Sequence, residues 1–151
     1  MMNAKEFFEQ ARQVNAVPQD ADLNDAWAFG VNASDLAKLV LHGVKTATSS
    51  GFEIYDVTHE SLPKAGTYDV LLDDDHKPVC IILIDTVEVV PFSHVSAEHA
   101  FKEGEGDRAL LSWQINHAKF FHRDYKKHKL VFNRHTSHVV LETFHVVFPT
   151  K

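Results

Sequence analysis

The sequence predicts an α+β domain with an antiparallel or mixed sheet, an arrangement that a small curled β-barrel with flanking helices would satisfy. Helical patterns come first along the chain, then a hairpin, a helical insertion and a closing hairpin, so the strands do not follow a βαβ rhythm. The 151 residues fit one domain, and the 44% hydrophobic fraction supplies a core. We therefore predict a single domain over 1–151, with a helix and connector over 1–25 and a barrel core over 26–149.

Two helices are predicted in the first part of the chain. Asn3 and Glu6 form a capping-box pattern, and apolar residues follow at helical spacing. Residues 15–25 are polar, contain one proline and are interpreted as a connector. A second helix is predicted from Ser34, a favourable N-cap residue, to Gly43, where a left-handed cap would end it.

A hairpin is predicted in the middle of the chain. Residues 67–72 read as one strand, and the charged segment 73–77 reads as a solvated turn. Pro78 opens the next strand, which is long, rich in β-branched residues and predicted over 79–90. Cys80 lies in this strand, and a buried structural thiol is its expected state.

A helical insertion over about 96–122 is predicted to follow. Ser96 would cap a short helix through Phe101, and the glycine-containing segment 103–107 would break it. Asp107 would then cap a longer helix to about His122.

The longer helix is expected to turn Leu111, Ile115 and Ala118 inward. Two strands are predicted after it, at 129–132 and 139–148. The second has apolar residues on both faces, so it should lie in the interior of the sheet.

The chain's composition predicts a cytoplasmic protein. Cys80 is the single cysteine, so no intramolecular disulfide can form. The first residues lack the apolar core of a signal peptide, and no apolar run approaches the roughly 20 residues that span a bilayer. We expect no membrane segment.

The charge distribution is uneven. The formal net charge of −6 argues against a protein that coats nucleic acid by charge alone. Residues 117–138 nevertheless carry a single acid and six basic residues: Lys119, Arg123, Lys126, Lys127, Lys129 and Arg134. This segment can be a solvated helix face or a surface that contacts phosphate.

Lys45, Thr46 and Thr48 follow the predicted end of the second helix. A lysine amine that is desolvated near a hydroxyl can take its proton and make it a nucleophile. Residues three apart point to opposite faces of a regular strand, so Lys45 and Thr48 could converge only across a turn or bulge. Spacing alone favours a surface lysine followed by strand-forming threonines.

The acidic segment Glu103-Gly104-Glu105-Gly106-Asp107 is a second candidate. Glycines between carboxylates let a backbone approach a ligand closely. The carboxylates could bind a metal, orient water or act as general acid or base. The alternative is a flexible loop that ends in Asp107 as a helix cap.

The eleven histidines do not predict a metal site. His117 and His122 are about 140° apart on a helix and cannot share one ion. His135 and His138 lack an evident third ligand. The patterns HExxH, GxxxxGK[ST], GxGxxG and GxSxG do not occur. We expect no metal and no cofactor.

Aromatic residues form a small cluster before the second helix. Trp27 and Phe29, beside Gly30, could stack on a nucleobase or plug the core, and the sequence favours neither. Trp113, on the longer helix, is expected in the core.

These segments, in this order, resemble the ASCH (activating-signal-cointegrator homology) domain family, and its longer bacterial branch in particular. The resemblance covers about Trp27 to Phe148. It is carried by Trp27-Ala28-Phe29-Gly30, the second helix, Gly43-Val44-Lys45-Thr46-Ala47-Thr48, the strand pair around Tyr68 and Pro78, and Glu103-Gly104-Glu105-Gly106-Asp107 followed by Trp113, His117 and Phe120-Phe121.

The resemblance implies a PUA-like β-barrel with flanking helices and a role in binding RNA at the G-x-K-x-x-T element. Some smaller relatives are amidohydrolases that deacetylate acetylated cytidine with a Lys, a Thr and a Glu. These roles carry over to Lys45, Thr48 and Glu103, with Glu105 as a rival for the glutamate. Other relatives are reported as ribonucleases.

The first hypothesis is accordingly a metal-independent amidohydrolase acting on a modified nucleoside. Lys45 would deprotonate Thr48, and Thr48 would attack the amide carbonyl to form an acyl-enzyme. Glu103 would protonate the leaving amine and then activate water, while backbone amides near the turn hold the oxyanion.

The second hypothesis is a non-catalytic RNA-binding module, and the third is a ribonuclease in which Lys45 stabilises phosphate charge. In the module, Lys45 would contact phosphate and an aromatic residue would stack on a base. No obligate protein partner is expected. The predicted substrate- or RNA-binding residues are Trp27, Phe29, Gly43, Thr46, Lys119, Arg123 and Lys126.

Overall fold

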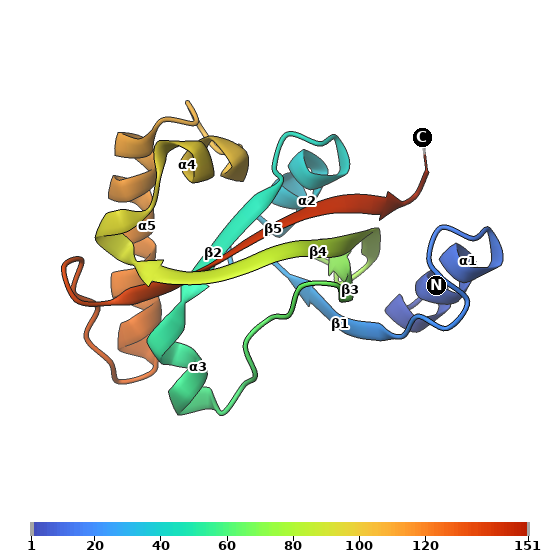
Figure 1. Ribbon diagram of the computed structural model, residues 1–151, viewed down its shortest axis with the longest axis horizontal. Helices are drawn as coiled ribbons and strands as arrows, with labels where there is room; N and C mark the ends of the chain where they lie inside the picture. Colours follow the sequence, from blue (N-terminus) through green and yellow to red (C-terminus); the bar gives the residue numbers. More distant parts are fainter. Residues whose placement is uncertain (1, 151) are drawn as a thin grey trace. The chain divides into compact units, whose positions relative to one another are not determined.

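The computed structural model describes residues 2–150. Figure 1 labels its helices and strands. In chain order they are α1 (Ala4–Gln13), β1 (Leu23–Ala28), α2 (Ala33–Leu41), β2 (Ala47–Gly51), α3 (Phe52–Thr58), β3 (Tyr68–Leu72), β4 (Pro78–Pro91), the 3-10 turn η1 (Phe92–His94), α4 (Ala97–Glu103), α5 (Leu110–Lys127) and β5 (His138–Phe148).

The described residues form two compact units. The first unit comprises the chain up to Thr46, residues 64–85 and the chain from Phe144 onward. The second unit comprises residues 47–63 and 86–143. Strands β4 and β5 pass through both units, so each unit holds a part of the same sheet.

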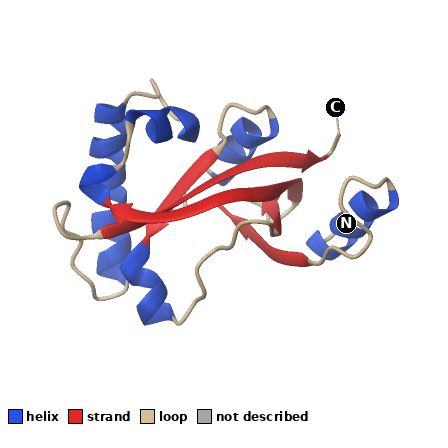
Figure 2. Ribbon diagram, viewed as in Figure 1, coloured by secondary structure: helices blue, strands red, loops and turns tan. Residues whose placement is uncertain are grey.

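The sheet has five strands in the order β1-β3-β4-β5-β2. Figure 2 distinguishes the strands, in red, from the helices, in blue. The pair β1–β3 is parallel, whereas β3–β4 and β2–β5 are antiparallel. The predicted α+β class with a mixed sheet is confirmed, and so is the interior position of the last strand. The predicted barrel is wrong: the sheet is not closed, because β1 and β2 end the strand order and do not pair with each other. The single-domain boundaries stay a prediction.

The first unit contains the apolar face of α1. The capping box is confirmed, because Asn3 Oδ1 accepts from the Glu6 amide at 2.9 Å and the Glu6 carboxylate accepts from the Asn3 amide at 3.3 Å. Phe8 and Ala11 are buried in one cluster with Val70, among others. Strand β1 begins at Leu23, inside the segment predicted as a connector.

Helix α2 begins earlier than predicted. Its N-cap is Asn32 in a left-handed conformation (φ 49°), and the hydroxyl of Ser34 instead accepts from the amide of Asp74 at 3.0 Å. The predicted stop is confirmed: Gly43 follows the helix with φ +76°, a conformation that glycine adopts without strain. Helix α3, which follows β2 directly, had no predicted counterpart.

Helix α5 packs a different face than predicted. Leu111 and Ile115 are 67% and 47% exposed, so their predicted inward orientation is wrong. The residues that are buried on this helix are Trp113, Phe121 and Tyr125, which are spaced by multiples of four. The true apolar face therefore includes aromatic rings rather than the two aliphatic side chains.

The predicted strand at 129–132 is also wrong. Lys129 has a left-handed φ of 60°, and no strand forms between the end of α5 at Lys127 and the start of β5 at His138. Phe132 of this segment packs in the core instead: it is 2% exposed, and its ring centroid lies 5.1 Å from that of Phe92. The exposure of Val131 (88%) shows that only one side of the segment is buried.

Candidate functional site

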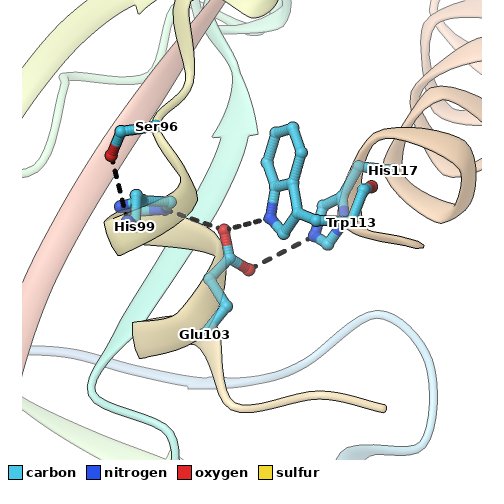
Figure 3. Close-up of polar contacts among 5 residues, drawn as sticks. All are labelled: Ser96, His99, Glu103, Trp113 and His117. Atoms are coloured by element: carbon cyan, nitrogen blue, oxygen red, sulfur yellow. Dashed lines mark hydrogen bonds and ion pairs between the residues drawn. The ribbon is translucent and has the colours of Figure 1, made fainter. Parts of the chain in front are cut away.

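Glu103 is a buried carboxylate surrounded by N–H donors in the second unit (Figure 3). It is 1% exposed, although it ends a helix. Its Oε2 atom accepts from His99 Nε2 and Trp113 Nε1, each at 2.8 Å, and its Oε1 atom lies 3.2 Å from His117 Nε2. Burial of an ionised carboxylate is costly unless donors replace water, and here both oxygens have them. The carboxyl group is therefore fixed in position and partnered.

Local sequence explains how α4 supplies two of these groups. The side chain of Ser96 accepts from the His99 amide at 3.0 Å, which confirms the predicted cap and starts the helix. His99 and Glu103 are four residues apart and so lie on one face. Gly104, in a left-handed conformation (φ 72°), ends the helix directly after Glu103.

Helix α5 supplies the other two groups. Trp113 and His117 are again four residues apart, and their rings stack with centroids 4.2 Å apart and planes inclined by 14°. His117 Nδ1 donates to the carbonyl of Trp113 at 3.0 Å. Asp107 accepts from the Ala109 amide at 2.9 Å, which lowers the pKa of its carboxyl, but the helix cap itself is Ala109.

Thr48 lies in β2 of the same unit, and helix α4 contacts this strand. In the antiparallel pair, Thr48 stands opposite Glu142 of β5. Residues directly opposite each other in such a pair share one face of the sheet. Glu142 is 7% exposed, so a buried glutamate that sequence reasoning did not identify stands beside Thr48.

Of the three residues predicted to be catalytic, Lys45 lies in the first unit. It is 1% exposed, so the surface lysine that spacing favoured is wrong. Its Nζ atom lies 5.3 Å from the centre of the Phe29 ring, within the range of a cation–π contact. Phe29 in turn meets Trp27 edge to face, with ring centroids 4.9 Å apart.

Trp27 is oriented by a buried aspartate. Its indole Nε1 donates to Asp69 Oδ2 at 2.9 Å, and Asn24 donates to Asp69 Oδ1 at the same distance. Burial raises the pKa of Asp69, an effect that these two hydrogen bonds oppose. The aromatic pair therefore packs between Asp69 and Lys45 within the first unit, and its rings are part-buried rather than core plugs.

The remaining predicted binding residues lie outside these two groups. Gly43 is exposed at the end of α2, and the carbonyl of Thr46 accepts from the Phe144 amide at 3.0 Å. The basic residues Lys119, Arg123 and Lys126 are all exposed on α5. Their spacing of four and three residues aligns them along one face of that helix.

One group of side chains within residues 2–150 has the composition of a metal site. Glu103, Glu105 and His117 each offer a ligand atom, and these atoms lie within 4.8 Å of one another. His117 Nε2 and Glu103 Oε1 are already bonded to each other, so an ion would have to displace that bond. We assign no ion to this group.

The structure thus brings together two sets of residues, one in each unit. In the second unit, Glu103 joins His99, Trp113 and His117; from the sequence, Trp113 was expected in the core and the two histidines were given no role in the site. Their i, i+4 spacing along two helices was the available signal, but this spacing does not show that residues of both helices bind Glu103. The joint action of Lys45, Thr48 and Glu103 stays a prediction.

Comparisons with known proteins agree with this architecture. The family model described as "ASCH domain" matches residues 25–148. A crystal structure of an ASCH domain from Lactobacillus crispatus JV V101 has a TM-score of 0.86 and 34% identity, and the match covers 93% of this chain and 91% of that one. A crystal structure of a protein from Enterococcus faecalis V583 has a TM-score of 0.83 and 34% identity, covering 93% and 85%. No curated protein matches the chain.

The chain belongs to the ASCH domain family. This is a PUA-like family with a proposed role in RNA binding. Among the described residues, no helix is both long and apolar enough to cross a membrane.

Proposed function

We propose that this protein is a metal-independent amidohydrolase that removes the acyl group from an acylated cytidine. The observation that carries the proposal is Glu103: a carboxyl group that is 1% exposed and positioned by three side-chain donors. Fixed, buried acid–base groups are typical of sites that move a proton at a defined atom. The substrate class comes from the family resemblance.

The reaction has two stages, and its protons balance. Lys45 takes the proton of the Thr48 hydroxyl, the Thr48 oxygen attacks the amide carbonyl, and Glu103 gives a proton to the departing amine. Water then gives a proton to Glu103 as its oxygen attacks the acyl-enzyme. The Thr48 oxygen leaves with the proton held by Lys45, which restores all three side chains.

The burial of Lys45 favours this role over a contact with RNA phosphates. A side chain that is 1% exposed is poorly placed to reach a phosphate backbone on the surface. A buried lysine instead suits a role inside the protein, and the proposal gives it the hydroxyl of Thr48, three residues along the chain, as its partner.

The test is to incubate the protein with acetylated cytidine and to measure free cytidine by chromatography. Wild-type protein should release cytidine, and Lys45→Ala, Thr48→Val and Glu103→Gln should each lower the rate by at least about 10²-fold. Thr58→Val is the matched control, because it removes the same hydroxyl from helix α3 in the same unit as Thr48.

Two results would contradict the proposal. No turnover by the wild-type protein would exclude this activity. Equal rates for wild type and Lys45→Ala would remove Lys45 from the mechanism even if turnover occurs. Circular dichroism of each variant separates a lost activity from a lost fold.

The basic face of α5 supports a second candidate function, an RNA-binding module. Lys119, Arg123 and Lys126 are exposed on one helix in a protein whose overall charge is negative. Such a local concentration of cations suits contacts to a phosphate backbone.

This candidate predicts a salt-dependent affinity for single-stranded RNA. Affinity should fall between 50 and 200 mM salt by about tenfold or more if three phosphates are neutralised. A variant with alanine at Lys119, Arg123 and Lys126 should lose most of that dependence. No binding at low salt would exclude the module, and cleavage of the RNA probe would instead indicate a ribonuclease.

A further inference from the structure

His117 has both ring nitrogens directed at oxygen atoms. Nδ1 lies 3.0 Å from the carbonyl oxygen of Trp113, and Nε2 lies 3.2 Å from Oε1 of Glu103. A carbonyl oxygen only accepts hydrogen bonds, so Nδ1 must carry a hydrogen. In a neutral imidazole, Nε2 would then be an acceptor.

A neutral His117 facing an ionised Glu103 would place two acceptors against each other, so the resting geometry disfavours that state. We infer that the His117–Glu103 pair holds one proton more than a neutral imidazole and a carboxylate together, and that His117 is the positioning residue that stores it for Glu103. His99 imposes no such condition, because its single bond from Nε2 to Glu103 is satisfied by a neutral ring.

The surroundings place the stored proton on His117 at rest. Its ring lies flat against the indole of Trp113, at 4.2 Å and 14°, and the face of an indole attracts a positive charge. Glu103 faces N–H donors from His99 and Trp113 as well, which favours its ionised form. The resting pair is thus an imidazolium beside a carboxylate.

This inference rests on the proposed function for its chemical use. When Glu103 protonates the leaving amine, the proton lost from the pair can pass from His117 Nε2 to Glu103 Oε1 along their hydrogen bond. Water later returns one proton to the pair as it attacks the acyl-enzyme. No bond to His117 other than this N–H bond changes.

Nuclear magnetic resonance of the wild-type protein at pH 7 tests the proton count without any substrate. Long-range ¹H–¹⁵N spectra report the hydrogens on the His117 ring, and the ¹³C shift of the Glu103 carboxyl reports its charge; His117→Gln and Glu103→Gln identify the signals. We expect two protonated nitrogens on His117, with Glu103 ionised. A single protonated nitrogen on His117 together with an ionised Glu103 would overturn the inference.

A kinetic comparison tests the use of the proton, with His99→Gln as the matched control. Both glutamine variants keep an N–H donor for Glu103, but only His117→Gln removes the stored proton. With acetylated cytidine, kcat should fall about 10²-fold for His117→Gln with little change in KM, and by less than about tenfold for His99→Gln. Equal losses would overturn the role of His117. Absent turnover by the wild type would overturn the proposed function, and the resonance measurement would still decide the proton count.

Discussion

Trp113 and His117 stack along helix α5 with their ring centroids 4.2 Å apart. The same indole donates its N–H to Glu103 at 2.8 Å, so one side chain holds both the carboxylate and its histidine partner. Trp113 is 5% exposed and packs on Phe92 on the core side. The predicted core role of Trp113 is confirmed, and the structure adds a polar role to it.

Trp113→Phe should therefore destabilise the protein beyond the loss of packing. It keeps an aromatic ring at the position but removes a donor to a buried carboxylate, which should cost about 1.5–3 kcal/mol in the free energy of unfolding. Urea denaturation followed by circular dichroism measures the change.

A double-mutant cycle separates the hydrogen bond from the packing. In a Glu103→Leu background the indole has no carboxylate to which it can donate. Trp113→Phe should therefore lower the free energy of unfolding by at least about 0.5 kcal/mol less than it does in the wild type. Identical costs in the two backgrounds would show that the bond to Glu103 contributes nothing measurable.

Phe29→Leu should destabilise the protein through Lys45. The substitution removes the ring face that lies 5.3 Å from the lysine Nζ, and while the amine is protonated this cation–π contact is worth about 0.5–2 kcal/mol. Phe7→Leu is the control, because Phe7 packs edge to face on Phe148 with ring centroids 5.1 Å apart. In a Lys45→Met background, thermal or urea unfolding should show a smaller cost for Phe29→Leu and an unchanged cost for Phe7→Leu.

Sequence reasoning succeeded where the determining contacts are local. The capping box of Asn3 and Glu6, the cap at Ser96 and the left-handed Gly43 each depend on residues within one turn, and all three are present. Strand β1 was missed because its segment is polar and its pairing is with β3, more than 40 residues further along the chain.

The candidate site was predicted in part for the same reason. The glycine-spaced carboxylates drew attention to residues 103–107 and the family resemblance then singled out Glu103, but its donors come from two different helices whose packing no spacing reveals. Leu111 and Ile115 were wrongly predicted to face inward because an aromatic series spaced by four residues fills the core better than the aliphatic residues beside it. Composition and spacing thus indicated the acidic segment 103–107 but not the groups that fix Glu103 in position.

Gly51→Ala should destabilise the protein, although the backbone of Gly51 is ordinary. With φ −76°, an alanine in open space would stabilise the fold by about 0.4–1 kcal/mol. A Cβ atom at Gly51 would overlap Cε1 of Tyr125, and that ring is held by a 2.7 Å hydrogen bond to Glu53. The overlap should cost about 1–3 kcal/mol in the free energy of unfolding, so the variant should be less stable than the wild type in urea denaturation. A more stable variant would contradict this prediction.

Two aspartates of the first unit should affect stability with opposite dependence on pH. Burial raises the pKa of Asp69 above 3.8, so its contribution to stability is full below pH 3.8 and is lost as pH rises through the folded-state pKa. The backbone amide of Lys77 lowers the pKa of Asp73, so the contribution of Asp73 to stability is present above pH 3.8 and is lost as pH falls.

Asparagine variants test these signs, because asparagine does not titrate in this range. The unfolding free energy of wild type minus that of Asp69→Asn should decrease as pH rises above 3.8, since only the wild type loses the contribution of a raised pKa. The same difference for Asp73→Asn should increase from below pH 3.8 upward. Urea denaturation at intervals from pH 3 to 7 measures both. If the two free-energy differences changed with pH in the same direction, this would contradict the assignment of Asp69 as the buried carboxyl that orients Trp27.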